Sequence, residues 1–199
     1  MKFKFLDIER ELKAQEKKPE VSTEEVNGQI LHTIEVLMEK GIYEKNPKIF
    51  TGMVHYLAET KLNCRKKGLL LFGQTGTGKT FAAKIIAAFR DINFFTSDDL
   101  MRIYQSNKDS FWEIIDEKKD LIIDDLGAEP TMNDFGMRFE LFAQAITARH
   151  RLYEYRGIRT IITTNLSGQA IKERYSERIY SRLRQMCETI NATGEDLRQ

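Results

Sequence analysis

From residue 68 onward, short apolar runs alternate along the chain with segments of helical periodicity. The apolar runs predict strands at 68–73, 93–96, 120–124, 158–164 and about 186–191. Helices of moderate length are expected between them. Alternation of this kind gives a parallel sheet that is covered by helices on both faces. Such sheets bind their ligands at the carboxyl ends of the strands.

The sequence before residue 65 carries helical patterns only. A charged segment at 13–20 is the best linker candidate in the chain. Residues 1–18 are therefore either a separate partner-binding helix or a solvated helix that packs on its own domain. Ser22 and Glu25 have the spacing of a capping box, and the helix that they open is expected to stop at Gly41.

A third helix is expected to begin at Asn46-Pro47 and to carry Ile49, Met53 and Leu57 on one face. We therefore divide the chain into a helical N-terminal extension, residues 1–64, and a core, residues 65–199. The core is expected to be a three-layer αβα fold with a parallel sheet of about five strands.

Residues 73–80 read Gly-Gln-Thr-Gly-Thr-Gly-Lys-Thr, a complete G-x-x-x-x-G-K-[ST] phosphate-binding loop, or Walker A motif. A strand precedes it and a helix follows it, which is the context that the motif requires. The glycines let backbone N–H groups point at a polyphosphate, and the helix N-terminus adds its positive dipole end. Lys79 is expected to reach the β- and γ-phosphates, and Thr80 to place its hydroxyl on Mg²⁺. The predicted nucleotide-binding residues are Gly73, Gln74, Thr75, Gly76, Thr77, Gly78, Lys79, Thr80 and Phe81.

The third predicted strand ends in two carboxylates, Asp124 and Asp125. In this position Asp124 has the Walker B role of holding Mg²⁺, directly or through water. Asp125 is then expected to orient or deprotonate the attacking water. Most ATPases of this type use glutamate there, and the shorter aspartate stands about one methylene further from the water, which favours slow hydrolysis.

The fourth predicted strand ends at Asn165. An asparagine after a strand is commonly a turn residue. Because it follows the two phosphate-site motifs in chain order, we predict that Asn165 senses the γ-phosphate or the attacking water.

Arg178 and Arg182 are four residues apart and share one helical face. Either is a candidate arginine finger that reaches the nucleotide of a neighbouring subunit. The alternative is a solvated basic face that is balanced by Glu173 and Glu177. A finger that acts in trans implies nucleotide-dependent self-association.

Composition bears on nucleic-acid binding, on metal binding by cysteine and on cellular location. The net charge of +1 gives no bulk electrostatic argument for nucleic-acid binding. Cys64 and Cys187 have no metal-type spacing and are interpreted as buried thiols. The chain lacks a signal-peptide pattern and a long apolar run, so we expect a cytoplasmic protein.

Two local basic clusters remain candidates for contact with single-stranded DNA. The first comprises Lys61, Arg65, Lys66 and Lys67, and the second comprises Arg149, Arg151, Arg156 and Arg159. Tyr153 and Tyr155 are interleaved with the second cluster, and aromatic rings can stack on bases. Solvated helix ends are the more common explanation for such basic runs.

The motifs together resemble the AAA+ helicase-loader family, the DnaC/DnaI group, and the related IstB-like ATPases that assist transposases. The resemblance covers about 68–198 and rests on the phosphate loop, on 95–100, 123–127 and 163–166, and on the segment 177–183. It also includes the ending Gly194-Glu195-Asp196-Leu197-Arg198. Arg198 matches an arginine of the family, and no role is assigned to it here.

The resemblance implies an ATPase that uses ATP and Mg²⁺ and acts in DNA replication on a hexameric replicative helicase. It also implies contact of the core with single-stranded DNA, and base-contacting residues near 46–50. This chain is expected to carry no C-terminal helical lid domain after the sheet, and family members with the same truncated layout are similar to it. A transposase-assisting ATPase, a P-loop small-molecule kinase and a nucleotide-binding protein without turnover remain alternatives.

Overall fold

The computed structural model describes residues 28, 32, 35–36, 39, 41–61, 67–129, 132–134, 137–139 and 141–197. The predictions for the helix at 1–18, for the Ser22 capping box, for Cys64 and for Arg198 lie outside the described residues. Gly41 has a φ of 63° and lies in a turn. A helix was predicted to stop there, and a left-handed glycine commonly follows the last residue of a helix.

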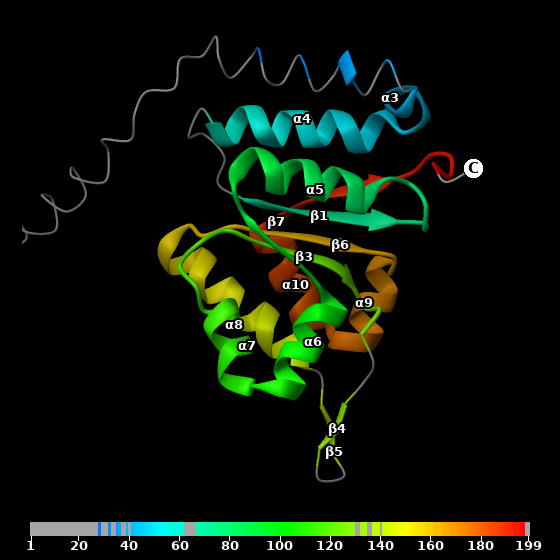
Figure 1. Ribbon diagram of the computed structural model, residues 1–199. Coiled ribbons are helices and arrows are strands. Elements are labelled where there is room, and N and C mark those ends of the chain that lie inside the picture. The colour runs from blue at the N-terminus through cyan, green and yellow to red at the C-terminus, as the bar shows by residue number, and fades with distance from the viewer. Residues whose placement is uncertain are drawn as a thin grey trace, which may run out of the picture.

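Five parallel strands form the central sheet, in the spatial order β2-β3-β6-β1-β7 (Figure 1). The strands are β1 (Gly68–Gly73), β2 (Asn93–Thr96), β3 (Leu121–Leu126), β6 (Thr160–Thr164) and β7 (Cys187–Ala192). This confirms the five predicted strands and the parallel sheet. The prediction for the third strand ended at Asp124, whereas β3 continues through Asp125 to Leu126.

Successive residues of the inner strands face opposite sides of the sheet, as the pleat requires. Leu69 and Leu71 of β1 pack on one side, and Leu70 packs on the other. The strands are apolar almost throughout because helices cover both faces.

Helices α4 (Pro47–Lys61) and α5 (Lys79–Arg90) cover one face of the sheet (Figure 1). The predicted third helix is thereby confirmed as α4, preceded by the short α3 (Ile42–Lys45). The buried side chains of α4, which include Ile49, Phe50 and Met53, share one apolar core with α5 and the strands. The predicted domain boundary at residue 64 stays a prediction. It falls between α4 and β1, although α4 packs on the sheet that β1 belongs to.

The opposite face is covered by a second layer of helices (Figure 1). These are α6 (Ser97–Ser106), α7 (Lys108–Ile115), α8 (Leu141–Arg156), α9 (Gly168–Tyr175) and α10 (Glu177–Met186). Two layers of helices around a parallel sheet are the predicted αβα architecture. A small antiparallel pair, β4 (Met132–Asp134) and β5 (Met137–Phe139), projects from this side of the molecule.

Arg149 of α8 is fully buried between this helix layer and the sheet. Its guanidinium donates to the hydroxyl of Thr160 and to four backbone carbonyls, those of Ile115, Glu117, Lys119 and Arg159, at 2.8 to 3.2 Å. Burial lowers the pKa of Arg149 to about 10. Arg149 therefore fixes the segment that precedes β3 against the start of β6 and is an internal structural residue.

Within the described ranges, no helix has the length and apolar character that crossing a membrane requires. Cys187 is buried, and its thiol lies 3.4 Å from the carbonyl oxygen of Thr160. This agrees with the interpretation of Cys187 as a buried thiol.

Candidate nucleotide-binding site

The predicted phosphate loop connects β1 to the N-terminus of α5. Gly76 and Gly78 have φ values of 84° and 89°, which L-residues with a side chain rarely adopt. A Cβ atom at Gly76 would lie 2.1 Å from a carboxylate oxygen of Asp196, so this glycine also permits a close approach. Thr77 stabilises the curl by donating to the carbonyl of Gln74 at 2.9 Å.

The amine of Lys79 lies inside this curl. It donates to the carbonyl oxygens of Gly73 and Gln74 at 2.9 and 2.6 Å, and the side chain is nearly buried. These contacts hold the ammonium group against the loop, where a bound polyphosphate would meet it. The position agrees with the role predicted for Lys79.

A cavity of about 410 Å³ opens over the loop and the start of α5. This volume lies in the range of cavities that hold small-molecule ligands. Its lining brings together side chains from the phosphate loop, α5, the end of β3 and the end of β6, namely Thr75, Gly76, Gly78, Lys79, Thr80, Phe81, Lys84, Asp125, Asn165 and Leu197. Of the residues predicted to bind nucleotide, Gly73, Gln74 and Thr77 shape the loop without lining the cavity.

Asp124 lies directly beneath this cavity and is 1% exposed. Its carboxylate accepts a hydrogen bond from the hydroxyl of Thr163 at 2.5 Å and another from Thr80. Burial raises the pKa of Asp124 above its ordinary value, and the nearby charge of Asp125 adds to the rise. The hydrogen bonds and the charge of Lys84 oppose it. The hydroxyl of Thr80 and the carboxylate of Asp124 are thus adjacent, as predicted for a shared metal ion.

Asp125 follows in an unusual backbone conformation. The register between β3 and β6 shifts between Ile123 and Leu126, and Asp125 itself has a φ of 55°. Bulges of this kind re-aim a side chain at the end of a strand. Aspartate tolerates the left-handed region better than most residues. The side chain of Asp125 consequently lines the cavity, while that of Asp124 is buried beneath it.

Asn165 lies one residue beyond β6 and also lines the cavity. The structure therefore brings Asp125 and Asn165 to the same cavity as the phosphate loop. The two preceding threonines face inward and connect β6 to β3. Thr163 accepts from the amide of Asp125 at 2.9 Å, and Thr164 donates to the carbonyl of Leu126 at 2.5 Å.

The C-terminal segment closes one side of the cavity. Leu197 lines it, and the amide of Leu197 donates to the carbonyl of Gly76 at 2.9 Å. Asn46, at the start of α4, donates to the carbonyl of Glu195 at 3.0 Å. Residues around position 46, expected near the base, therefore hold the chain end beside the loop. Further along α4, Phe50 packs edge-on against Phe81.

The candidate arginine fingers lie on α10, outside the lining of the cavity. Arg182 donates to the hydroxyl of Thr147 on α8 at 2.5 Å, so it has a partner within its own chain. Arg178 is exposed in the first turns of α10. The geometry distinguishes the two arginines, which the sequence treated alike.

The second basic cluster does not form an open surface as predicted, and the first cluster stays a prediction. Arg149 is buried, and Arg159 forms an ion pair with Asp120 at 2.6 Å, so neither belongs to an open basic surface. Arg151 and Arg156 remain exposed on α8. Of the first cluster, the side chain of Lys67 is described, and those of Lys61, Arg65 and Lys66 lie outside the described side chains.

Three residues of the site were not predicted. Lys84 follows Thr80 by one helical turn, and this spacing indicated that the two side chains lie on the same face of the helix. Thr163 sits at an inward position of an otherwise apolar strand, which is a weaker signal. Nothing local to Leu197 indicated that the chain end returns to the phosphate loop.

Known proteins were compared with this chain by sequence and by fold. A sequence model described as RNA helicase matches residues 69–152, which is less than half of the chain. No curated protein sequence matches the chain. The solved structure of DnaI is similar at 20% identity and a TM-score of 0.55, over 72% of this chain and 84% of that one. Domain III of the replication initiation protein DnaA from Thermotoga maritima is similar at 18% identity and a TM-score of 0.53, over 73% of this chain and 62% of that one.

The chain has the AAA+ P-loop NTPase fold of DnaI and DnaA. A structure of the DnaC helicase loader is also similar, at 24% identity and a TM-score of 0.49, over 83% of this chain and 89% of that one. In this AAA+ fold, the phosphate loop, the end of β3 and the end of β6 meet at one edge of the sheet.

Proposed function

We propose that this chain binds Mg²⁺ and ATP, hydrolyses the ATP slowly, and uses this switch to load or remodel a hexameric replicative helicase. The observation that carries the proposal is the shared cavity. Lys79, Asp125 and Asn165 come from three separate strand ends and line one cavity that fits a small ligand.

Phosphate binding follows from the loop. Left-handed glycines let the loop curl so that backbone N–H groups can face a phosphate, and the N-terminus of α5 adds a positive end. The ammonium group of Lys79 supplies a full charge at the same place. A triphosphate is the ligand class that meets all three features at once.

The residues present fit a magnesium ion. Mg²⁺ prefers hard oxygen ligands and commonly takes one or two protein groups together with phosphate oxygens. Thr80 supplies a hydroxyl and Asp124 a buried carboxylate whose raised pKa reflects the cost of burying a charge. When bound, the ion would neutralise charge that develops on the transferring phosphoryl group.

Hydrolysis is assigned to Asp125 as the residue that orients or deprotonates the attacking water, with Asn165 as a second polar contact. Both side chains face the cavity. Because aspartate is one methylene shorter than the usual glutamate, we expect slow turnover.

Self-association is proposed to complete the site. Arg178 and Arg182 lie on α10, away from the cavity of their own chain. If an arginine of α10 acts on a nucleotide, we expect that nucleotide to be bound to a neighbouring subunit. Its exposure makes Arg178 the better candidate, since Arg182 is bonded to Thr147.

A role in replication is supported by the ordered motif set that resembles helicase loaders and by the fold shared with a replication initiation protein. A transposase-assisting ATPase would share this core. A small-molecule kinase is less well supported, because the Asp-Asp strand end and Asn165 are typical of ATPases. Contact with single-stranded DNA is also proposed, through Arg151 and Arg156 of the second basic cluster.

The first experiment is ATP turnover by the purified chain with and without single-stranded DNA, beside a Lys79→Ala variant. We expect slow turnover that DNA raises and that Lys79→Ala abolishes. A purified hexameric replicative helicase is then added, and its ATP-dependent loading onto single-stranded DNA is measured. Absence of loading together with stimulation by a transposase would favour the transposition reading. Release of ADP only with a small-molecule acceptor would favour the kinase.

A further inference from the structure

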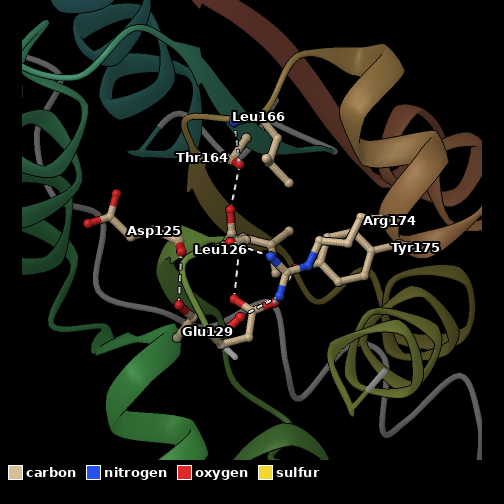
Figure 2. A network of polar contacts seen from close by, with 9 residues as sticks. Asp125, Leu126, Glu129, Thr164, Leu166, Arg174 and Tyr175 are labelled. Carbon is tan, nitrogen blue, oxygen red and sulfur yellow. Dashed lines mark hydrogen bonds and ion pairs between the residues drawn. The ribbon is translucent and has the colours of Figure 1, made fainter. Parts of the chain in front are cut away.

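A buried carboxylate lies just beyond the catalytic end of β3. The side chain of Glu129 is 2% exposed. It accepts hydrogen bonds from the amide of Gly127 at 2.7 Å, from the guanidinium of Arg174 at 3.1 Å and from the hydroxyl of Tyr175. Figure 2 shows these groups converging between the end of β3 and α9. The ATPase assignment makes no use of them.

Arg174 contacts the backbone of the turn at Gly127–Glu129, whose amide at Gly127 is bonded to the Glu129 side chain. Besides its ion pair with Glu129, its guanidinium donates to the carbonyl oxygens of Gly127 and Glu129. A planar, forked guanidinium can serve several acceptors in one fixed geometry, which a lysine cannot do. The amide and the carbonyl of Gly127 are therefore both held by one ion pair.

The turn that this ion pair holds is the one that carries Asp125. Gly127 has a φ of 101°, and a Cβ atom there would lie 2.5 Å from the side chain of Leu166. Asp125 is itself left-handed, and its carbonyl accepts from Ser97 and from the amide of Ala128. A left-handed non-glycine residue persists only where its surroundings over-determine it.

Other hydrogen bonds connect the end of β3 to the segment that carries Asn165. Leu166 donates its amide to Thr164, whose hydroxyl donates to the carbonyl of Leu126. Arg174 belongs to α9, the helix that follows this segment. The end of β3 is thus bonded to β6 through Thr164, and the turn that follows β3 is bonded to α9 through Glu129 and Arg174.

We propose that Glu129 and Arg174 are positioning residues that hold the Asp125–Gly127 turn and thereby set the rate of ATP hydrolysis. This rests on the proposed ATPase function. Buried ion pairs often contribute little more stability than apolar side chains of the same volume. What this pair supplies is a fixed backbone geometry two residues from the side chain that faces the attacking water. In Figure 2 the carboxylate of Asp125 points away from the pair, and neither Glu129 nor Arg174 lines the cavity.

The test separates nucleotide binding from turnover in three variants, Glu129→Gln, Arg174→Lys and Tyr175→Phe. Binding is measured with a fluorescent ATP analogue, and turnover is measured at saturating ATP. We expect Glu129→Gln and Arg174→Lys to lower kcat at least about tenfold, because small misplacements of a reacting group cost rates of this order. Nucleotide affinity should stay within about twofold, since the phosphate loop is untouched.

A control variant, a milder variant and a hydrogen-exchange measurement keep the outcome decisive. Glu173→Gln is the control for Glu129→Gln. It makes the same chemical change at an exposed residue of α9, directly before Arg174, and should leave kcat unchanged. Tyr175→Phe removes one donor to Glu129 and leaves the ion pair intact, so it should give a smaller loss of kcat. This variant tests the proposal even if the other two variants fold poorly. Amide hydrogen exchange at Gly127 should be faster in Glu129→Gln than in the unmodified protein.

Equal kcat in the unmodified protein and in folded Glu129→Gln and Arg174→Lys would overturn the proposal. A matched loss of affinity and kcat would also overturn it, because that result indicates general loss of structure. If the unmodified chain has no turnover, the proposed ATPase function fails by itself. Exchange at Gly127 then still decides whether Glu129 holds the turn, and unchanged exchange would overturn that as well.

Discussion

The hydroxyl of Thr163 lies 2.5 Å from the carboxylate of Asp124. The same hydroxyl oxygen accepts the backbone amide of Asp125 at 2.9 Å. One side chain of β6 thus contacts both carboxylate-bearing residues at the end of β3. It fixes the buried carboxylate of Asp124 and the bulge that turns the side chain of Asp125 toward the cavity.

Replacing Thr163 by valine keeps the shape and removes the hydroxyl. Asp124 then loses a donor and the amide of Asp125 loses its acceptor, and we expect the free energy of unfolding to fall by about 1–3 kcal/mol. Turnover should fall about tenfold or more because both carboxylates lose their alignment. Chemical denaturation and steady-state ATP hydrolysis measure the two effects. Thr163→Ser retains the hydroxyl and should stay near the unmodified protein; equal losses in both variants would contradict the assigned role.

Asp124→Asn should stabilise the protein at neutral pH in the absence of Mg²⁺. Burial raises the pKa of Asp124 in the folded protein above its ordinary value of 3.8. The folded state therefore binds this proton more tightly than the unfolded chain, and stability is lost as the pH rises through the folded pKa. Removing the buried charge should raise the free energy of unfolding at pH 7 by about 1 kcal/mol.

The difference between Asp124→Asn and the unmodified protein should close as the pH falls below 3.8, where both carry a neutral side chain. Urea denaturation across a pH series measures it. A less stable Asp124→Asn variant at pH 7 would show that the hydrogen bonds outweigh the cost of burying the charge.

Arg149→Lys should destabilise the fold strongly although it conserves the charge. A lysine cannot reach the five acceptors that surround the Arg149 guanidinium, and several buried carbonyls would lose their donor. We expect a loss of about 3–5 kcal/mol in the free energy of unfolding, measured by chemical denaturation. Arg151→Lys, on the exposed side of the same helix, should change stability by less than about 0.5 kcal/mol. A small effect of Arg149→Lys would mean that the loop before β3 does not depend on it.

Arg178→Ala should abolish turnover without affecting stability, whereas Arg182→Ala should mainly destabilise by removing the contact with Thr147. Subunit mixing tests whether the finger acts in trans. Arg178→Ala has an intact phosphate loop, and Lys79→Ala has an intact Arg178, so mixing the two inactive variants should restore part of the activity. An inactive mixture, or full activity of Arg178→Ala alone, would remove Arg178 as the finger.

The sequence by itself determined the chemistry class of the protein. The phosphate loop, the paired aspartates and the five strand runs are local patterns, because each depends on spacing within about ten residues. Asn165 was found through its order in the chain after those motifs. The strand limits were predicted to within a few residues, apart from the bulge that extends β3 past Asp124.

Only the tertiary structure decided which distant side chains meet. Thr163 and Asp124 are brought together because β6 lies beside β3 in the sheet, and no local pattern encodes that neighbour relation. The same holds for Glu129 with Arg174, and for Leu197 with the phosphate loop. Arg149 was misassigned to a basic surface because its charge is visible in the sequence while its buried acceptors are backbone carbonyls. Backbone groups have no sequence signature, so their partners can be known only once the chain is folded.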